Sequence, residues 1–253
     1  MLNDILTLNI YAFVVILVRT GTVFVMMPGL GSQQVNMQAR LYFTLATTFL
    51  LTPVLAGQLP AMPATPMGLG VLMAGEAFAG LVLGSVTRVL FAAVQVTGTV
   101  TSFVSGMANS MIFDPISEQQ SAIVAGFMGV IATLLMFVTN LHHVLIQALV
   151  DSYSLFRPGF TPNFGDSLQL IATNVALTFR IGVQMATPFL VVAFAYYVGL
   201  GLMTRLTPQL PIFFVAMPLQ IILALGTLAI VIGSLMLTFL KHVEGGLEPF
   251  ILL

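Results

Sequence analysis

Long apolar runs alternate with short breaks rich in proline and glycine along the whole chain. The apolar runs cover six stretches, at about residues 5–27, 39–55, 68–112, 121–150, 168–200 and 217–240. The breaks fall at Pro28-Gly29, Pro60 to Pro66, Asp114-Pro115, Pro158 to Pro162 and Pro208 to Pro211. Unbroken runs of this kind favour α-helix over the alternating pattern of a membrane barrel, because a helix pairs its backbone N–H and C=O groups internally. The pattern predicts an all-α, polytopic membrane-type protein of about six hydrophobic helical blocks.

The block at 68–112 is too long for one membrane crossing. A helix over its full length would extend about 68 Å, whereas the hydrocarbon layer is about 30 Å thick. We therefore expect kinked or broken long helices, or a helix that extends beyond the bilayer. Gly80 and Gly84 form a pair of small residues at helical spacing, which suits close packing against another helix.

Composition and charge narrow the class of function. Hydrophobic residues make up 58% of the chain and charged residues 6%, and the mean hydropathy is +1.08, whereas about a quarter of the residues of soluble domains are charged. The formal net charge of −1 provides no basic surface for nucleic acid, so we expect no nucleic-acid partner. The absence of cysteine excludes disulfides and thiol chemistry.

Several polar residues interrupt the apolar runs, at a cost of several kcal/mol for each lone charge at bilayer depth. We take them as candidates for contacts between helices or subunits: Arg19, Glu76, Arg88, Gln95, Arg180 and Gln184. Glu76 and Arg88 are twelve positions apart, about 120° around a helix, so they cannot pair along one straight face. Three interpretations stay open, namely structural pairing, a polar conduit and coupled proton transport. Pairing is favoured, because no second carboxylate stands at helical spacing from Glu76.

The sequence offers no residues for a reaction. The three histidines are His142, His143 and His242, and neighbours on a helix point about 100° apart, which does not suit joint metal binding. No Walker loop, HExxH motif or Gly-x-Ser-x-Gly elbow is present. We expect neither an enzyme nor a bound cofactor or metal.

The stretch SFVSGMANSMIFDPISEQQS at 102–121 joins an apolar block to a polar segment with a proline. Phe103, Met107 and Met111 recur at every fourth position, which would place them on one face of a helix. Two interpretations follow from this spacing. The side chains form an ordinary methionine-rich core contact, or they form a deformable hydrophobic seal that closes a pore by excluding water.

Three patches of sequence together resemble the FliR family of flagellar export proteins, whose relatives in virulence secretion systems are called SctT. The first patch is Arg19 in the first helix followed by PGLGSQQVNMQARLYFTLATTFLLTP at 28–53. The second is GEAFAGLVLGSVTRVLFAAVQVTG at 75–98, leading to SGMANSMIFDP at 105–115. The third is TRLTPQLPIFFVAMPLQI at 204–221. Met37, Thr99 and Gln220 depart from the family, which commonly has a proline, an acidic and a basic residue at these places.

The resemblance implies a core subunit of the bacterial flagellar type III export gate, through which unfolded flagellar proteins cross the inner membrane at the basal body. Its partners would be FliP-like and FliQ-like subunits, an FlhB-like protein and the unfolded flagellar export substrates. The gate would be a conical helical assembly raised towards the periplasm. Residues of about 1–165 would form a FliP-like portion, and about 166–253 a FliQ-like hairpin with the C-terminal tail.

The resemblance also implies two functional segments. The family's pore-blocking loop corresponds to about 106–121, with these candidates for the plug: Gly106, Met107, Ser110, Met111, Ile112, Phe113, Asp114 and Pro115. The tip of the FliQ-like hairpin would face the cytoplasm and include Arg205, Pro208, Gln209 and Pro211. The alternatives from other classes are a secondary transporter of a small solute or ion, which also has broken helices and buried charges, and a polytopic membrane enzyme.

Overall fold

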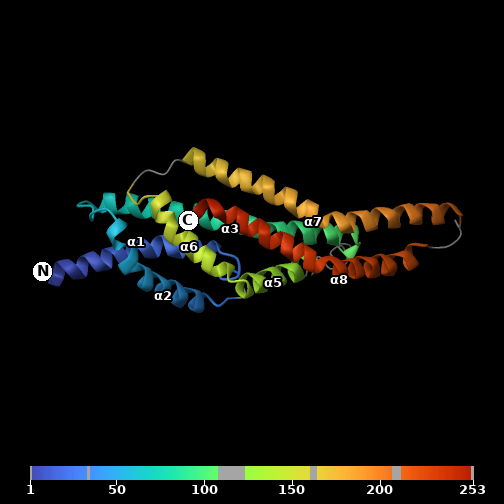
Figure 1. The fold of residues 1–253 in the computed structure, drawn as a ribbon, viewed down its shortest axis with the longest axis horizontal. Coiled ribbons are helices and arrows are strands. Elements are labelled where there is room, and N and C mark those ends of the chain that lie inside the picture. The colour runs from blue at the N-terminus through green and yellow to red at the C-terminus, as the bar shows by residue number, and fades with distance from the viewer. Residues whose placement is uncertain (1, 33–34, 108–122, 160–163, 207–211, 252–253) are drawn as a thin grey trace. The chain divides into compact units, whose positions relative to one another are not determined.

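The computed structural model describes residues 2–32, 35–107, 123–159, 164–206 and 212–251 (Figure 1). All regular elements among these residues are helices, and none of them is a strand. The predicted all-α fold is confirmed. The elements in chain order are α1 (Leu2–Met26), α2 (Met37–Leu55), η1 (Ala56–Gln58), α3 (Pro66–Val104), α5 (Ile123–Val138), α6 (Leu141–Leu155), α7 (Phe164–Leu206), α8 (Ile212–Leu247) and η3 (Glu248–Phe250).

Turn residues set the first helix boundaries, as predicted. After α1 the chain reaches Gly29, which has a φ of 82°, a conformation that glycine adopts without steric cost. The side chain of Asn36 caps α2, since its Oδ1 accepts a hydrogen bond of 2.9 Å from the backbone N–H of Gln38. Helix α3 begins at Pro66, where the missing N–H of proline leaves no helical hydrogen bond unmade.

Two predicted blocks differ from the structure. In the block expected at 68–112, helix α3 ends at Val104, because Gly106 has a φ of 74°, which is incompatible with a continued right-handed helix. The four-residue spacing predicted that Phe103 and Met107 share one helical face, and this prediction is wrong because α3 ends between them. The block expected at 121–150 is divided into α5 and α6 by Asn140, whose φ is 60°. Asparagine is among the few residues that tolerate this left-handed conformation.

Four of the described helices are long and apolar enough to cross a membrane, or five if α5 and α6 are counted as one broken span. The chain is therefore a membrane-embedded protein. These helices differ in how much of their surface the chain itself covers. In the 18-residue apolar stretch of each helix, the share of residues that the chain itself buries is 56% for α3, 22% for α7 and 17% for Ala216–Phe250. Helices α7 and α8 thus present apolar side chains to lipid or to other protein chains.

The chain divides into two compact units. The first comprises Met1–Leu90, Met136–Val175 and Val243–Leu253. In it α1 and α2 lie side by side (Figure 1), and its core includes Ile16 of α1, Leu55 of α2 and Tyr153 of α6.

The second unit comprises Phe91–Leu135 and Ala176–His242. Phe91 and Phe239 pack edge to face there, with 5.0 Å between their ring centroids. Backbones approach closely at two glycines, because a Cβ on Gly98 would overlap Ala125 and a Cβ on Gly182 would lie 2.7 Å from Cβ of Val96.

Candidate functional site

An arginine and a glutamate form an ion pair inside the first unit. Arg19 of α1 donates from Nε to Oε2 of Glu76 at 2.7 Å and from Nη2 to Oε1 at 3.0 Å. Both residues are 1% exposed. The two parallel hydrogen bonds give the planar guanidinium its most favourable geometry with a carboxylate.

The remaining donors of Arg19 bind α6 and the residue that follows it. Nη1 donates to Oγ of Ser152 at 3.2 Å, and Nη2 donates to the backbone carbonyl of Phe156 at 2.8 Å. The guanidinium carbon lies 3.8 Å from the centroid of the Tyr153 ring, which adds a cation–π contact. The Phe156 carbonyl follows the last turn of α6, where no further helical N–H is available to it. One side chain thus connects α1, α3 and the end of α6.

This arrangement favours pairing over a conduit for ions. The positive charge of Arg19 and the negative charge of Glu76 balance each other, and each hydrogen-bonding nitrogen of the guanidinium has an acceptor. Such a pair contributes little net stability, because desolvating both ions offsets their attraction. It does impose one register on the helices that it joins, since an unpaired partner would be a buried charge.

Two glycines allow α3 to approach α1 at this level. A Cβ on Gly80 would overlap Oγ1 of Thr22 and lie 2.8 Å from the carbonyl oxygen of Arg19. A Cβ on Gly84 would lie 2.6 Å from Cβ of Met26. Because these separations are shorter than real Cβ contacts, the crossing requires glycine at both positions.

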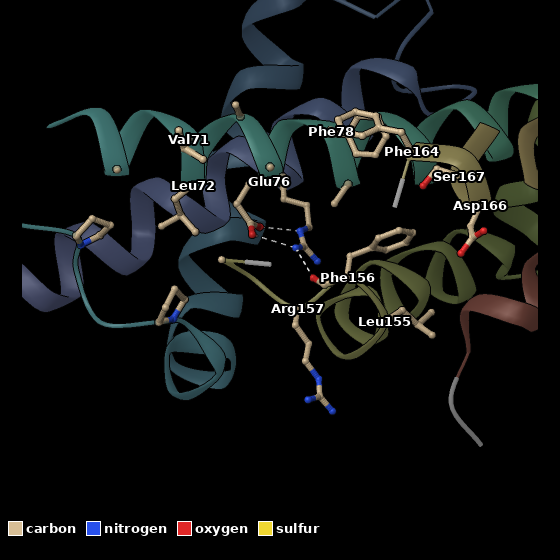
Figure 2. A pocket seen from close by; sticks show the side chains of 18 of the residues that line it. Val71, Leu72, Glu76, Phe78, Leu155, Phe156, Arg157, Phe164, Asp166 and Ser167 are labelled. Atoms are coloured by element: carbon tan, nitrogen blue, oxygen red, sulfur yellow. Dashed lines mark hydrogen bonds and ion pairs between the residues drawn. The ribbon is translucent and has the colours of Figure 1, made fainter. Parts of the chain in front are cut away.

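A cavity of about 920 Å³ opens beside the ion pair. Arg19 and Glu76 lie in its wall, and most of the other lining residues are apolar. Figure 2 shows Phe78 and Phe164 against each other at the cavity, and their ring centroids are 4.5 Å apart. The exposed side chain of Arg157 points away from the ion pair in this view. The cavity therefore offers a largely apolar surface, in which Arg19 and Glu76 are paired with each other while Arg157 and Asp166 are exposed.

The other candidate polar residues have exposed side chains. Arg88 is exposed on α3, and its Nη1 lies 3.9 Å from Sδ of Met26. Gln95 is also exposed, and its amide lies against Gly129 of α5. Arg180 and Gln184 are exposed on α7. These four side chains are available to groups outside the chain.

Most of the predicted plug lies outside the described residues. Gly106 and Met107 are described, and both are partly buried after the end of α3. Outside the description are Ser110, Met111, Ile112, Phe113, Asp114 and Pro115. For the predicted hairpin tip, Arg205 is exposed in the last turn of α7, whereas Pro208, Gln209 and Pro211 also lie outside the described residues.

Sequence reasoning assigned no function to a polar cluster in the second unit. The side-chain amide of Gln220, on α8, donates to the carbonyl oxygen of Val104 at 2.7 Å and to the hydroxyl of Tyr197 at 2.8 Å. Elsewhere in this unit Thr178 and His242 are hydrogen-bonded at 3.2 Å between Oγ1 and Nε2. In the sequence Gln220 is a single amide in an apolar run and a departure from the basic residue that the resembled family commonly has there. Its partners lie 116 and 23 residues away, so periodicity could not identify them.

In the part of the chain that the structure describes, no three His, Asp or Glu side chains gather where they could hold a metal ion. What the described residues provide is a paired buried charge, close helix crossings and extensive apolar surface. These features suit a protein that packs against other chains or lipid.

Comparisons with known proteins agree with the resemblance noted in the sequence. The family model described as "Bacterial export proteins, family 1" matches residues 10–246. The flagellar biosynthetic protein FliR of Caulobacter vibrioides is 31% identical over 242 residues, which cover 96% of each chain. FliR of Bacillus subtilis is 29% identical, over 83% of this chain and 82% of its own. The secretion system apparatus protein SsaT of Salmonella typhimurium is 26% identical, over 63% of this chain and 62% of its own. This chain therefore belongs to the bacterial export proteins, family 1, together with the flagellar biosynthetic proteins FliR.

Proposed function

We propose that the chain is a core subunit of the flagellar protein export gate, where it helps to form and plug the channel for unfolded flagellar proteins in the inner membrane. The observation that carries this proposal is the family match over residues 10–246, which includes α3, the plug segment and both long helices α7 and α8. The names of the FliR relatives favour the flagellar system over a virulence system. The alternative of a secondary transporter has no support in the names of these relatives.

As a member of this family the chain acts within a multi-subunit export apparatus. For its partners we propose FliP-like and FliQ-like subunits and an FlhB-like protein, in a gate at the basal body that is raised towards the periplasm. The apolar surface of α7 and α8 supports partners of this kind, since it is too large to remain in water. The division at about residue 165 into a FliP-like and a FliQ-like portion is part of the same proposal. Its support is that α7 and α8 pair through the hydrogen bond from the Tyr196 hydroxyl to the carbonyl of Ala216.

The plug would occupy residues 106–121. Gly106 gives this assignment a physical basis, because its φ of 74° ends α3 where the plug would begin. Beyond it the segment supplies Met107, Met111, Ile112 and Phe113. Methionine is unbranched and polarizable, so it adapts to irregular surfaces, and an apolar constriction excludes water and ions. The plug would yield to a passing chain and close again afterwards, while energy for transport comes from other components.

Replacement of residues 106–121 by a short Gly-Ser linker tests the proposal. Cells expressing the gate with this variant should leak potassium across the inner membrane, and the variant should still co-purify with its partners. A Gly-Ser replacement of residues 61–65, in the connection before α3, is the control and should leave the membrane tight. If the linker variant assembles and the permeability does not change, the plug is disproved.

A further inference from the structure

The polar cluster around Gln220 lies at the root of the plug segment. Gln220 is 9% exposed, and its amide nitrogen has two hydrogens and two acceptors, the Val104 carbonyl and the Tyr197 hydroxyl. All three residues belong to the second unit. We call these three groups the latch.

Val104 is the last residue of α3, so its carbonyl is among those that no later helical N–H can reach. The next two residues turn back locally, since the N–H of Ser105 donates to Thr101 and the N–H of Gly106 to Phe103. The Val104 carbonyl accepts instead from the side chain of Gln220, 116 residues later in the sequence. A residue of α8 thus completes the end of α3.

Gly106 lies directly against the same amide. A Cβ built on Gly106 would be 3.4 Å from Oε1 of Gln220 and 3.6 Å from its Nε2. Gly106 also has a positive φ, which an L side chain would make strained. The turn that leads out of α3 is therefore shaped by its own glycine and held from one side by Gln220.

The latch is sensitive to movement of α8. Hydrogen bonds of 2.7 and 2.8 Å are lost when donor and acceptor separate by about 1 Å. A displacement of α8 relative to α3 therefore breaks the bond to the Val104 carbonyl, whereas the bond to Tyr197 depends on the position of α7. The Val104 carbonyl would then lack its hydrogen-bond donor at the end of α3.

We propose that Gln220 is a positioning residue, which ties the end of α3 and the first residues of the plug segment to the α7–α8 pair. This inference rests on the proposed plug function. It adds that α8 holds Gly106 in place, so that a movement of α8 during export releases the first residues of the plug segment.

The test uses the assembled gate with three substitutions. Gln220→Met keeps the length of an unbranched side chain and removes the donor. Gln220→Lys keeps donors, and its positive charge suits the C-terminal end of α3. Tyr197→Phe removes one acceptor at a residue that is 51% exposed, so it should not disturb folding.

The reporter is Ser105→Cys, which is informative because the chain has no other cysteine and Ser105 is 2% exposed. Maleimide labelling of Cys at this position should be slow in the parent gate. Gln220→Met should accelerate the labelling by about tenfold, since the Val104 carbonyl then lacks its donor and the turn after α3 opens more often. Tyr197→Phe should accelerate it by about two- to threefold. Gln220→Lys should label as slowly as the parent.

Potassium leakage should follow labelling, with Gln220→Met leaking and Gln220→Lys tight. If the Met and Lys variants both label like the parent, or both label faster, hydrogen-bond donation is not what holds the turn and the proposal is overturned. If Gln220→Met does not assemble, Tyr197→Phe decides, and an unchanged labelling rate overturns the proposal. Failure of the plug itself gives a different result, because the Gly-Ser linker then causes no leak while labelling still reports on the latch.

Discussion

The buried ion pair between Arg19 and Glu76 gives the sharpest test of the fold. Removing one member leaves the other as an uncompensated charge at 1% exposure. We consider Glu76→Gln, Arg19→Leu and the double change Arg19→Leu with Glu76→Leu. Both single changes should be severe and the double change mild, because an apolar replacement of both partners removes the desolvation cost together with the attraction.

The expected magnitude follows from the contacts. Loss of one partner of a buried, hydrogen-bonded pair costs about 3–5 kcal/mol, and Arg19 also makes hydrogen bonds to Ser152 and Phe156. For a chain of this size about 2–4 °C of melting temperature corresponds to 1 kcal/mol, so each single variant should lose roughly 6–20 °C. Arg19→Lys should also be destabilising, because a compact ammonium cannot span the acceptors on α3 and α6 that the guanidinium fork reaches.

The measurement is retention of the chain in its complex after heating. Detergent-solubilised complexes are heated in steps and centrifuged, and the remaining chain is quantified by immunoblot. Arg157→Ala is the matched control, since Arg157 carries the same charge as Arg19, lines the same cavity and is exposed, with its side chain pointing away from the ion pair (Figure 2). It should leave the melting temperature of the chain unchanged. The reasoning is refuted if the single variants melt like the parent, or if the double variant is as unstable as the sum of the two single variants.

Two further variants test packing and outward contacts. Gly80→Ala should destabilise the chain by about 1–3 kcal/mol, because the new Cβ overlaps Thr22 on α1. Gly70→Ala is the control, at a position of α3 with open space, and it should be neutral or stabilising by up to about 1 kcal/mol. Equal effects of the two changes on thermal retention would contradict the close crossing of α1 and α3. Arg180→Ala combined with Gln184→Ala should leave the chain folded and membrane-inserted. The double change should reduce the amount of co-purifying partners by several-fold, because both side chains are exposed on α7. Unchanged recovery of the partners would show that these two side chains make no contact between subunits.

Helix boundaries could be predicted where proline and glycine act locally. The breaks at Pro28-Gly29 and before Pro66 needed only the conformational limits of these residues. The break at Asn140 was missed because asparagine permits a left-handed conformation without requiring it. The early end of α3 depends on Gly106, which the sequence singled out only as a candidate for the plug.

Partners across helices could not be predicted in the same way. Arg19, Arg88 and Arg180 look alike in the sequence, since each is a single cation in an apolar run. Arg19 pairs with Glu76, which is 57 residues away on another helix. Helical periodicity relates positions on one helix and contains no information on the register between two helices. The resemblance to a family indicated the function, and the structure showed the pairing.

Polar groups and glycines provide specificity that apolar contact cannot provide in this chain. In lipid a leucine gains little by leaving an acyl chain for another leucine, so apolar surface alone does not select one helix register. Glycine brings two backbones together, and a polar side chain then binds a group that the approach has made reachable. Arg19 binds Glu76 close to Gly80, where α1 and α3 approach each other. Thr97 donates to the carbonyl of Gly182 at 3.0 Å, at the close contact between Gly182 and Val96. Gln220 binds the end of α3 beside Gly106 by the same combination. The interior of each unit is thus fixed by a few directional contacts, which leaves the apolar faces of α7 and α8 available to lipid or to other protein chains.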